Sequence, residues 1–229
     1  MSDTMEIVSG LLSIIVINLV LSGDNAVVIG MAAHRLEPGQ RRMAILFGGG
    51  AAVVLRIALT AIAVALLRIP FLRLIGGLLL VWIAFHLLEE EEGAVGGTRA
   101  AASMRDAITT ILVADVVMST DNVLGVAAAS RDDLGLLIFG LVSSMAILMF
   151  LGGVVANLID RLWWLAYVGS AVIAWTGATL AMEDPFVVER IGEINAAIEY
   201  LVAGVVTLVT LAFAHWFHRV RGAQTLPSP

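Results

Sequence analysis

The sequence contains no cysteine and no lysine, and few of its residues carry a charge. Of its 229 residues, 14% are charged, whereas a typical soluble domain has about 25%. Without cysteine the chain forms neither disulfides nor thiolate metal sites, and it has no cysteine nucleophile. All 13 basic residues are arginine, and the net charge is −6. No basic stripe is left to neutralise phosphates, so we expect no nucleic-acid partner.

Apolar residues dominate what is present. They make up 60% of the chain, and the mean hydropathy is +0.98. We expect the first apolar run to be a spanning helix and not a cleavable signal peptide, because the start MSDTMEIV is acidic where a signal would be basic. A spanning helix needs about 20 mostly apolar residues. Seven stretches meet this length: residues 6–33, 43–67, 71–88, 106–129, 134–159, 163–182 and 197–217.

The placement of arginine predicts the orientation of these spans, because cytoplasmic loops carry an excess of Lys and Arg. With the N-terminus outside, eight arginines fall on the cytoplasmic side, namely Arg35, Arg41, Arg42, Arg99, Arg105, Arg161, Arg219 and Arg221. Four fall outside, namely Arg68, Arg73, Arg131 and Arg190. We therefore predict that the N-terminus lies outside and the C-terminus inside.

Two stretches carry nearly the same polar motif inside apolar runs. Residues 18–30 read NLVLSGDNAVVIG, and residues 115–127 read DVVMSTDNVLGVA. An ionised aspartate within a membrane span costs roughly 2.5–3.5 kcal/mol on insertion scales, so its presence at two equivalent positions predicts a function. At a constant offset of 97 positions, the matched residues are Ser22 with Ser119, Asp24 with Asp121, and Asn25 with Asn122.

The duplication extends over three helices in each half. Its further matches are Phe47-Gly48 with Phe139-Gly140, Gly76 with Gly169, and Trp82 with Trp175. Because three is odd, the second copy enters the membrane from the opposite face, as in the inverted repeats of many secondary transporters. We therefore predict an all-α membrane protein with seven transmembrane helices, arranged as a 3+3 inverted repeat plus one extra C-terminal helix.

This interpretation divides the chain into four parts. Residues 1–89 form the first three-helix repeat, and residues 106–182 form the second. Residues 90–105, rich in Glu and Gly, form a cytoplasmic linker, and we expect the glutamates at 89–92 to lie in a solvated loop. Residues 183–229 hold an external loop, the seventh helix and the C-terminal tail.

The motif residues predict a site for a hard metal cation near the bilayer midplane. Carboxylate, carboxamide, hydroxyl and freed carbonyl oxygens suit magnesium, calcium or manganese better than copper or zinc. Neighbouring Asp24 and Asn25 are about 100° apart on a regular helix, so they face one centre only where the helix is broken, for which Gly23 is suited, or where the site lies at a corner. Further candidates for the site or its coupling are Asn18, Ser22, Arg56, His86, Asp115, Met118 and Ser119.

Several of these residues also have a structural interpretation. Arg56 lies within a span, and we leave open whether Asp115 pairs with it or binds metal. Met118 and Met31 could add thioether ligands that favour a transition metal, although methionine usually fills apolar space. His86 is more often an interfacial side chain than a ligand.

At these residues the chain resembles a known family. The stretches SGDNAVVIG and DVVMSTDNVLGVA are similar to the paired aspartate–asparagine signatures of the TerC family of integral membrane proteins, within the LysE-type transporter superfamily. PFLRLIGGLLLVWIAFHLL resembles the third helix of the short, YjbE-like branch, and the likeness covers about residues 6–217. The resemblance implies seven helices and export of manganese across the bacterial cytoplasmic (inner) membrane. It also implies that the metal-site residues are Asp24, Asn25, Asp121 and Asn122.

We therefore predict a divalent-cation exporter, with manganese preferred, that works by alternating access and uses no prosthetic group. Its partners would be the metal ion, the lipid bilayer and, in a homo-oligomer, further copies of the chain. A proton-coupled transporter of another small solute is the main alternative. An intramembrane aspartyl protease, whose two acids share a proton, is the enzyme alternative. The chain has neither the Tyr-Asp nor the Gly-x-Gly-Asp sequence of such enzymes, so we predict that it is not an enzyme.

Overall fold

The computed structural model describes residues 22–66, 71–95, 103–129, 134–192 and 195–224, and residues 11, 12, 15, 16, 19 and 69 singly. Only the backbone is described for residues 61, 63–66, 92–95, 120–129, 134, 136, 218, 219 and 221–224. Helices and short turns make up this described part, and no strand occurs in it, which confirms the predicted all-α class. The helices are α2 Gly23–Ala33, α3 Pro38–Leu66, α4 Leu72–Val95, α5 Met104–Ala129, α6 Leu134–Ile159, α7 Trp164–Met182, α8 Pro185–Ile191 and α9 Ala196–Gln224.

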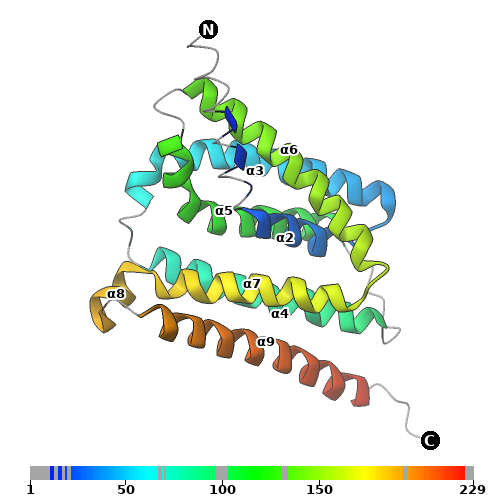
Figure 1. The fold of residues 1–229 in the computed structure, drawn as a ribbon. Helices are drawn as coiled ribbons and strands as arrows, with labels where there is room; N and C mark the ends of the chain where they lie inside the picture. The colour runs from blue at the N-terminus through cyan, green and yellow to red at the C-terminus, as the bar shows by residue number, and fades with distance from the viewer. Residues whose placement is uncertain are drawn as a thin grey trace, which may run out of the picture.

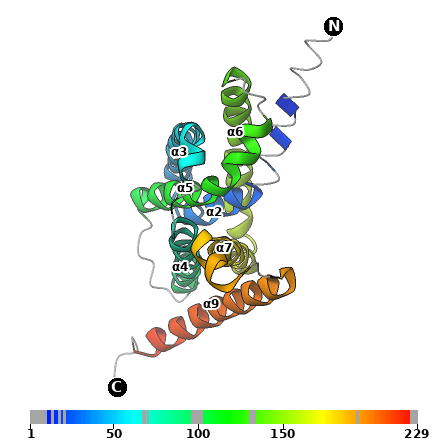
Figure 2. The same cartoon turned by 90° about the vertical axis from the view of Figure 1, so that its left-hand side faces the viewer.

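The helices are stacked so that α2 is enclosed. Figure 1 shows α3 and α6 on one side of α2 and α5, and α4 and α7 on the other, with α9 outermost. The turned view in Figure 2 keeps the same order. Helix α2 packs against α6, α5 and α7, while α9 packs on α7 and α4. The helix that begins in the first motif therefore lies at the centre of the bundle.

Among the described residues, five helices are long and apolar enough to cross a membrane. These spans are Pro38–Thr60, Leu72–Glu91, Leu137–Ile159, Trp164–Met182 and Ala196–Phe217. They correspond to five of the seven predicted spans. Predicted span 106–129 is helical as α5, and span 6–33 includes α2, while most of its earlier residues lie outside the described part. The total of seven spans stays a prediction.

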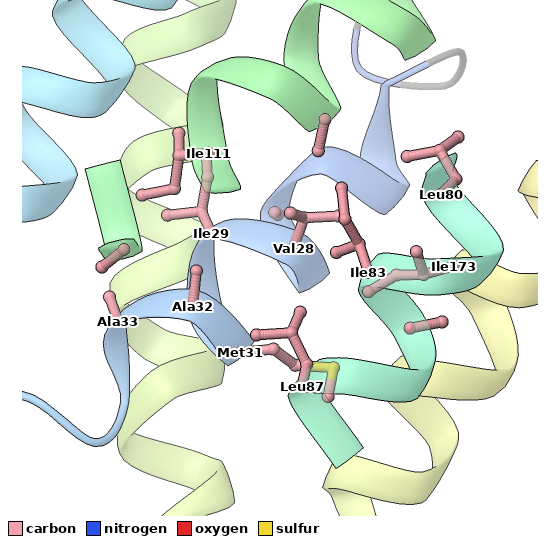
Figure 3. Packing of buried hydrophobic residues seen from close by; sticks show 14 of the residues in the cluster. Val28, Ile29, Met31, Ala32, Ala33, Leu80, Ile83, Leu87, Ile111 and Ile173 are labelled. Carbon is pink, nitrogen blue, oxygen red and sulfur yellow. The ribbon is translucent and has the colours of Figure 1, made fainter. Parts of the chain in front are cut away.

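The core is apolar around α2, and the outer faces are apolar too. In Figure 3, Ile29 lies beside Ile111 of α5, Val28 points toward Ile83 of α4, and Met31 lies against Leu87 of the same helix. Each of these six side chains is at most 7% exposed. Large apolar side chains also face outward, with exposures of 67–70%: Val54, Phe150, Leu201 and Leu208. Such a surface is suited to lipid and not to water.

Small residues bring helices into close contact at two places. A methyl group on Gly77 of α4 or Gly177 of α7 would overlap backbone atoms of the other helix. Between α2 and α6, a methyl group on Gly30 would overlap Val155, and one on Gly152 would overlap Ile29. Close backbone approach at small residues is typical of helix packing in membranes.

The glutamates at 89–92 are helical, so the expectation of a solvated loop is wrong. Helix α4 continues through them to Val95, into the predicted linker. Glutamate is a good helix former. In addition, Glu90 and Glu91 pair with basic side chains at the end of α2, which fixes them on the helix.

A short helix, α8, lies in the segment predicted to be an external loop. The sequence Asp184-Pro185 starts it, since Asp184 accepts a hydrogen bond from the backbone N–H of Phe186 at 2.9 Å and proline suits the first helical position. Asp184 is fully buried and also accepts from the N–H groups of Phe71 at 3.2 Å and Leu74 at 3.1 Å. One carboxylate thus joins the starts of α4 and α8.

Candidate functional site

Helix α2 begins inside the first motif, at the glycine where the sequence predicted a break. Gly23 is its first residue, and Ser22 precedes it with φ −119° and ψ 17°. The N–H of Asn25 lies 3.0 Å from both the carbonyl oxygen of Ser22 and Oδ1 of Asp24. The Asp24 carboxylate therefore lies at the positive end of a helix dipole, which stabilises an anion. Helix α5, in contrast, continues through the second motif without interruption.

Asp115 of α5 is the centre of a buried polar cluster. Its Oδ1 accepts a hydrogen bond from Nδ2 of Asn25 at 3.0 Å, and its Oδ2 accepts one from Oγ of Ser119 at 3.2 Å. Asn25, Asp115 and Ser119 are 2%, 3% and 1% exposed. Residues of the first and the second motif therefore meet at one carboxylate.

Helix α3 adds a cation to this cluster. Nη2 of Arg56 donates to Oδ1 of Asp115, and Nη1 donates to Oγ of Ser22 at 3.1 Å. Both charged side chains are 3% exposed. A buried ion pair needs such additional hydrogen bonds to offset the loss of hydration. Of the two alternatives that the sequence left open for Asp115, pairing with Arg56 is present in this structure.

Asp24 faces a different neighbour from Asn25. Its Oδ2 accepts a hydrogen bond from Oγ1 of Thr176 in α7 at 3.3 Å, and its side chain is half-buried. The adjacent residues Asp24 and Asn25 thus point to α7 and to α5, as their separation of about 100° on a regular helix requires. In this conformation the two side chains do not converge on one point.

Three predicted site residues have side chains outside the described part. Asn18 lies outside the described residues altogether, and Asp121 and Asn122 are described by their backbone in α5 alone. Met118 and Met31 are 3% and 1% exposed and belong to the apolar core.

His86 lies apart from the Asp115 cluster. Its ring stacks on that of Trp82, with the ring centroids 5.3 Å apart, and its Nε2 lies 3.3 Å from Oε1 of Glu90. Both contacts are within α4, on a partly exposed face.

A tight gap borders the cluster and has no room for a water molecule. It is lined by Asn25, Val28, Ile29, Ile111, Asp115 and Met145. Oδ1 of Asn25 is buried and has no hydrogen-bond partner among the described residues. Such an atom costs about 1–3 kcal/mol, and it can act as a hard ligand for a cation. In the described part, no three His, Cys, Asp or Glu side chains are grouped to hold a metal. In this conformation the guanidinium of Arg56 occupies the position beside Asp115.

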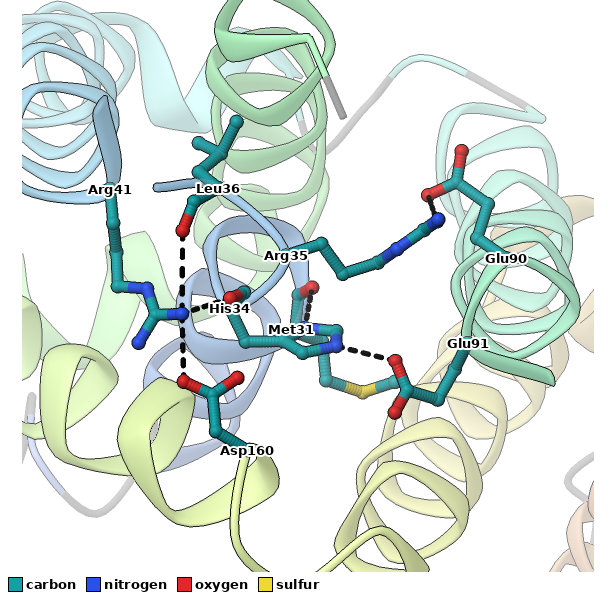
Figure 4. A network of polar contacts seen from close by, with 8 residues as sticks. All are labelled: Met31, His34, Arg35, Leu36, Arg41, Glu90, Glu91 and Asp160. Atoms are coloured by element: carbon teal, nitrogen blue, oxygen red, sulfur yellow. Dashed lines mark hydrogen bonds and ion pairs between the residues drawn. The ribbon is translucent and has the colours of Figure 1, made fainter. Parts of the chain in front are cut away.

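The C-terminal end of α2 is held to α4 by two contacts that sequence analysis did not single out. Nε2 of His34 lies 2.6 Å from Oε2 of Glu91, and Nη1 of Arg35 donates to Oε2 of Glu90 at 3.0 Å; Figure 4 draws both contacts. Nδ1 of His34 lies 2.8 Å from the carbonyl oxygen of Met31. Because a carbonyl oxygen only accepts, Nδ1 is the donor in this contact, and the His34 ring bridges the backbone of α2 and the side chain of Glu91.

Arg41 fastens the same end of α2 to α6. It forms an ion pair with Asp160 at 2.8 Å and donates to the carbonyl oxygens of His34 and Leu36 (Figure 4). It also donates to Oδ1 of Asn157 at 2.8 Å. The signal that could have revealed this network was a basic cluster after one predicted span and an acidic run after another, on the same predicted side of the membrane.

Comparison with known proteins gives a family match over nearly the whole chain. Residues 3–222 match the sequence model described as "Integral membrane protein TerC family". The chain is 40% identical over 174 residues to the "Uncharacterized membrane protein YjbE" of Bacillus subtilis (strain 168), covering 76% of this chain and 79% of that protein. It is 25% identical over 185 residues to the "UPF0053 inner membrane protein YgdQ" of Escherichia coli (strain K12), covering 73% and 78%. No solved structure matches the chain.

Proposed function

We propose that this chain, which belongs to the TerC family of integral membrane proteins, exports a divalent metal cation from the cytoplasm, with manganese as the preferred substrate. The observation that carries the proposal is the meeting of two polar motifs inside an apolar helical core. Asn25 and Asp115, which are 90 positions apart, are joined by a buried hydrogen bond. Intramembrane acids of this kind mark ion pathways by default.

The donor set fits a hard divalent ion. Two carboxylates, from Asp24 and Asp121, would neutralise a doubly charged ion, so that charged ligands and cargo are stable together in a low dielectric. The carboxamides of Asn25 and Asn122 would complete the oxygen ligands. Oδ1 of Asn25 supports this role, because it is buried without a partner in the described part.

The pattern of helix contacts supports the inverted repeat. Let the first unit contain α2, α3 and α4, and the second α5, α6 and α7. Exchange of the two units then converts the contact between α3 and α5 into one between α6 and α2, and both contacts exist. Helix α4 packs on α7, its own counterpart. A pseudo-two-fold axis produces this exchange symmetry.

Matched residues of the two units also have matched surroundings. Phe47 and Phe139 are 53% and 61% exposed, and the glycine after each is buried. Trp82 and Trp175 are 56% and 38% exposed. Equivalent positions facing lipid, and equivalent glycines facing protein, favour a true structural repeat over chance similarity.

We assign the end that holds the Figure 4 network to the cytoplasm, in the bacterial cytoplasmic membrane. Arg35, Arg41 and Arg42 lie there, which agrees with the positive-inside rule. The relative YgdQ is named an inner membrane protein. In alternating access this end must open to load the ion, so the contacts of His34 with Glu91 and of Arg35 with Glu90 would break in each cycle.

The proposal is tested by isosteric removal of the motif charges. Asp24→Asn and Asp121→Asn should each reduce Mn²⁺ efflux from proteoliposomes to background, while the protein still inserts. Asp106→Asn, at an exposed position in the first turn of α5, is the matched control and should transport like the parent. Efflux at the parental rate in both motif variants would refute the assignment.

Metal binding to the purified protein separates the exporter from the proton-coupled alternative. We expect saturable binding of Mn²⁺ that weakens in Asp24→Asn and in Asp121→Asn. A competition series with Mg²⁺ and Ca²⁺ gives the selectivity. Solute-dependent proton flux without any metal binding would favour the alternative.

A further inference from the structure

We propose that Arg56 is a tethered counter-cation that occupies Asp115 when no metal is bound and yields it when the metal enters. This inference rests on the proposed function and adds a residue that is absent from the predicted metal ligands. In the structure, the cation between the two motifs is a guanidinium: Arg56 contacts Ser22 of the first motif and Asp115 of the second.

Arg56 and a metal ion would compete because both contact the carboxylate of Asp115. Arg56 and Asn25 both donate to Oδ1 of Asp115 and Ser119 donates to Oδ2, so most of the acceptor sites of this carboxylate are filled, and the guanidinium charge repels a second cation. Asn25 holds its amide nitrogen toward Asp115 and leaves its Oδ1 without a partner in the described part, beside the gap that both residues line. An ion entering this gap meets Oδ1 of Asn25 first. It gains the carboxylate of Asp115 once the guanidinium has moved away.

The arginine and its partner acid are an addition to the duplicated unit. At the offset of 97 positions that aligns the motifs, Asp115 corresponds to Asn18. At the offset of 92 positions that aligns Phe47 with Phe139, Arg56 corresponds to Leu148. Both charges of the pair therefore stand where the other unit has a neutral residue. A pair needed only for packing the repeat would be expected in both units.

Replacement of the metal by Arg56 at Asp115 explains how the carrier can reorient when it carries no metal. After release of the metal, Asp115 would be an uncompensated charge at the centre of the bundle, which is costly in a membrane. Arginine stays protonated in proteins, so Arg56 neutralises that acid at any working pH. The same competition weakens metal binding, which a transporter needs in order to release its cargo.

The test compares net efflux with exchange, in proteoliposomes holding the full chain. Net efflux requires the empty carrier to return, whereas exchange of labelled for unlabelled Mn²⁺ does not. Arg56→Gln should lower net efflux at least about tenfold and leave exchange near the parental rate. Loss of the competing charge should tighten Mn²⁺ binding at least about tenfold, because close buried charge pairs are coupled by 1.4 kcal/mol or more. Arg42→Gln, an exposed arginine of the same helix, should change neither quantity.

A paired variant keeps the test decisive if Arg56→Gln does not fold. Arg56→Gln/Asp115→Asn removes both charges together, and we expect it to bind Mn²⁺ more weakly than the parent, since Asp115 no longer reaches the ion. The inference is overturned if Arg56→Gln keeps the parental ratio of net efflux to exchange, or if the paired variant binds Mn²⁺ as tightly as the parent. If the parent itself moves no Mn²⁺ in either mode, the proposed function fails instead.

Discussion

Opening of the end that we assign to the cytoplasm can be measured directly, because the chain contains no cysteine. Val28→Cys places a single thiol beside the gap at Asn25, and Val28 is 2% exposed. This thiol should react slowly with a membrane-impermeant maleimide added from the cytoplasmic side. In the same background, Glu91→Gln removes the carboxylate that binds His34, and we expect the labelling rate to rise.

The size of the effect follows from two contacts. His34 and Glu91 are 2.6 Å apart, and their side chains are 5% and 14% exposed. This contact therefore has the strength of a charge-assisted hydrogen bond, about 1.5–3 kcal/mol. Arg35 and Glu90 are 3.0 Å apart, and Glu90 is 40% exposed. The free energy of this contact therefore falls in the range of solvent-exposed ion pairs, about 0.2–1 kcal/mol. Because 1.4 kcal/mol is a factor of ten, Glu91→Gln should raise the open population about 10- to 100-fold, and Glu90→Gln at most about fivefold.

The control variant is Glu37→Gln, which changes an exposed glutamate between α2 and α3 at the same end of the molecule. It should label at the rate of the Val28→Cys protein. If Glu91→Gln labels no faster than this control, the ion pairs do not keep the cytoplasmic end closed and the reasoning from Figure 4 is wrong.

Two predictions concern stability and are measured by thermal unfolding of the protein in detergent. Gly177→Ala should lower the melting temperature, because its Cβ would overlap the carbonyl oxygen of Gly77. The control is Gly204→Ala, whose Cβ would have its nearest neighbour 3.9 Å away and should not change the melting temperature. Equal melting temperatures of the two variants would contradict the close contact of α4 with α7. Asp184→Asn should destabilise by about 1–3 kcal/mol, since a carboxamide has one acceptor oxygen and leaves at least one of the three N–H groups without its partner. Glu189→Gln, exposed on α8, should be neutral, and an equal loss in both variants would argue against the role of Asp184.

The five spans found in the described part were predictable because each depends on the local sequence alone. A helix in lipid satisfies its backbone groups within one segment, so an apolar run of sufficient length predicts it. The glutamates at 89–92 lacked this simplicity. Four successive charges favour a solvated loop by hydropathy, although glutamate is a good helix former. The contacts of Glu91 with His34 and of Glu90 with Arg35, more than fifty positions away, hold these side chains on the helix. Hydropathy carries no information about such partners.

The motif geometry was partly predictable from helix periodicity. The separation of about 100° predicts different directions for Asp24 and Asn25 on an unbroken helix, and they keep different partners, Thr176 and Asp115, even though α2 begins at Gly23. Which way Asp115 would turn was left open, because the choice between Arg56 and a metal depends on how α3 is rotated against α5. That rotation is a property of packing between segments, and no pattern within either segment encodes it.

The asymmetry of the Arg56–Asp115 pair bears on which conformation the carrier prefers. Under the proposed repeat, exchanging the two units converts one access state into the other, so two identical units would give two states of equal energy. The mirror positions of the pair hold Leu148 and Asn18, which cannot form an ion pair. The pair therefore has different surroundings in the two access states, so these states need not be equal in energy. The proposal requires that Arg56 stays against Asp115 in both states, so that the empty carrier returns without an uncompensated buried charge.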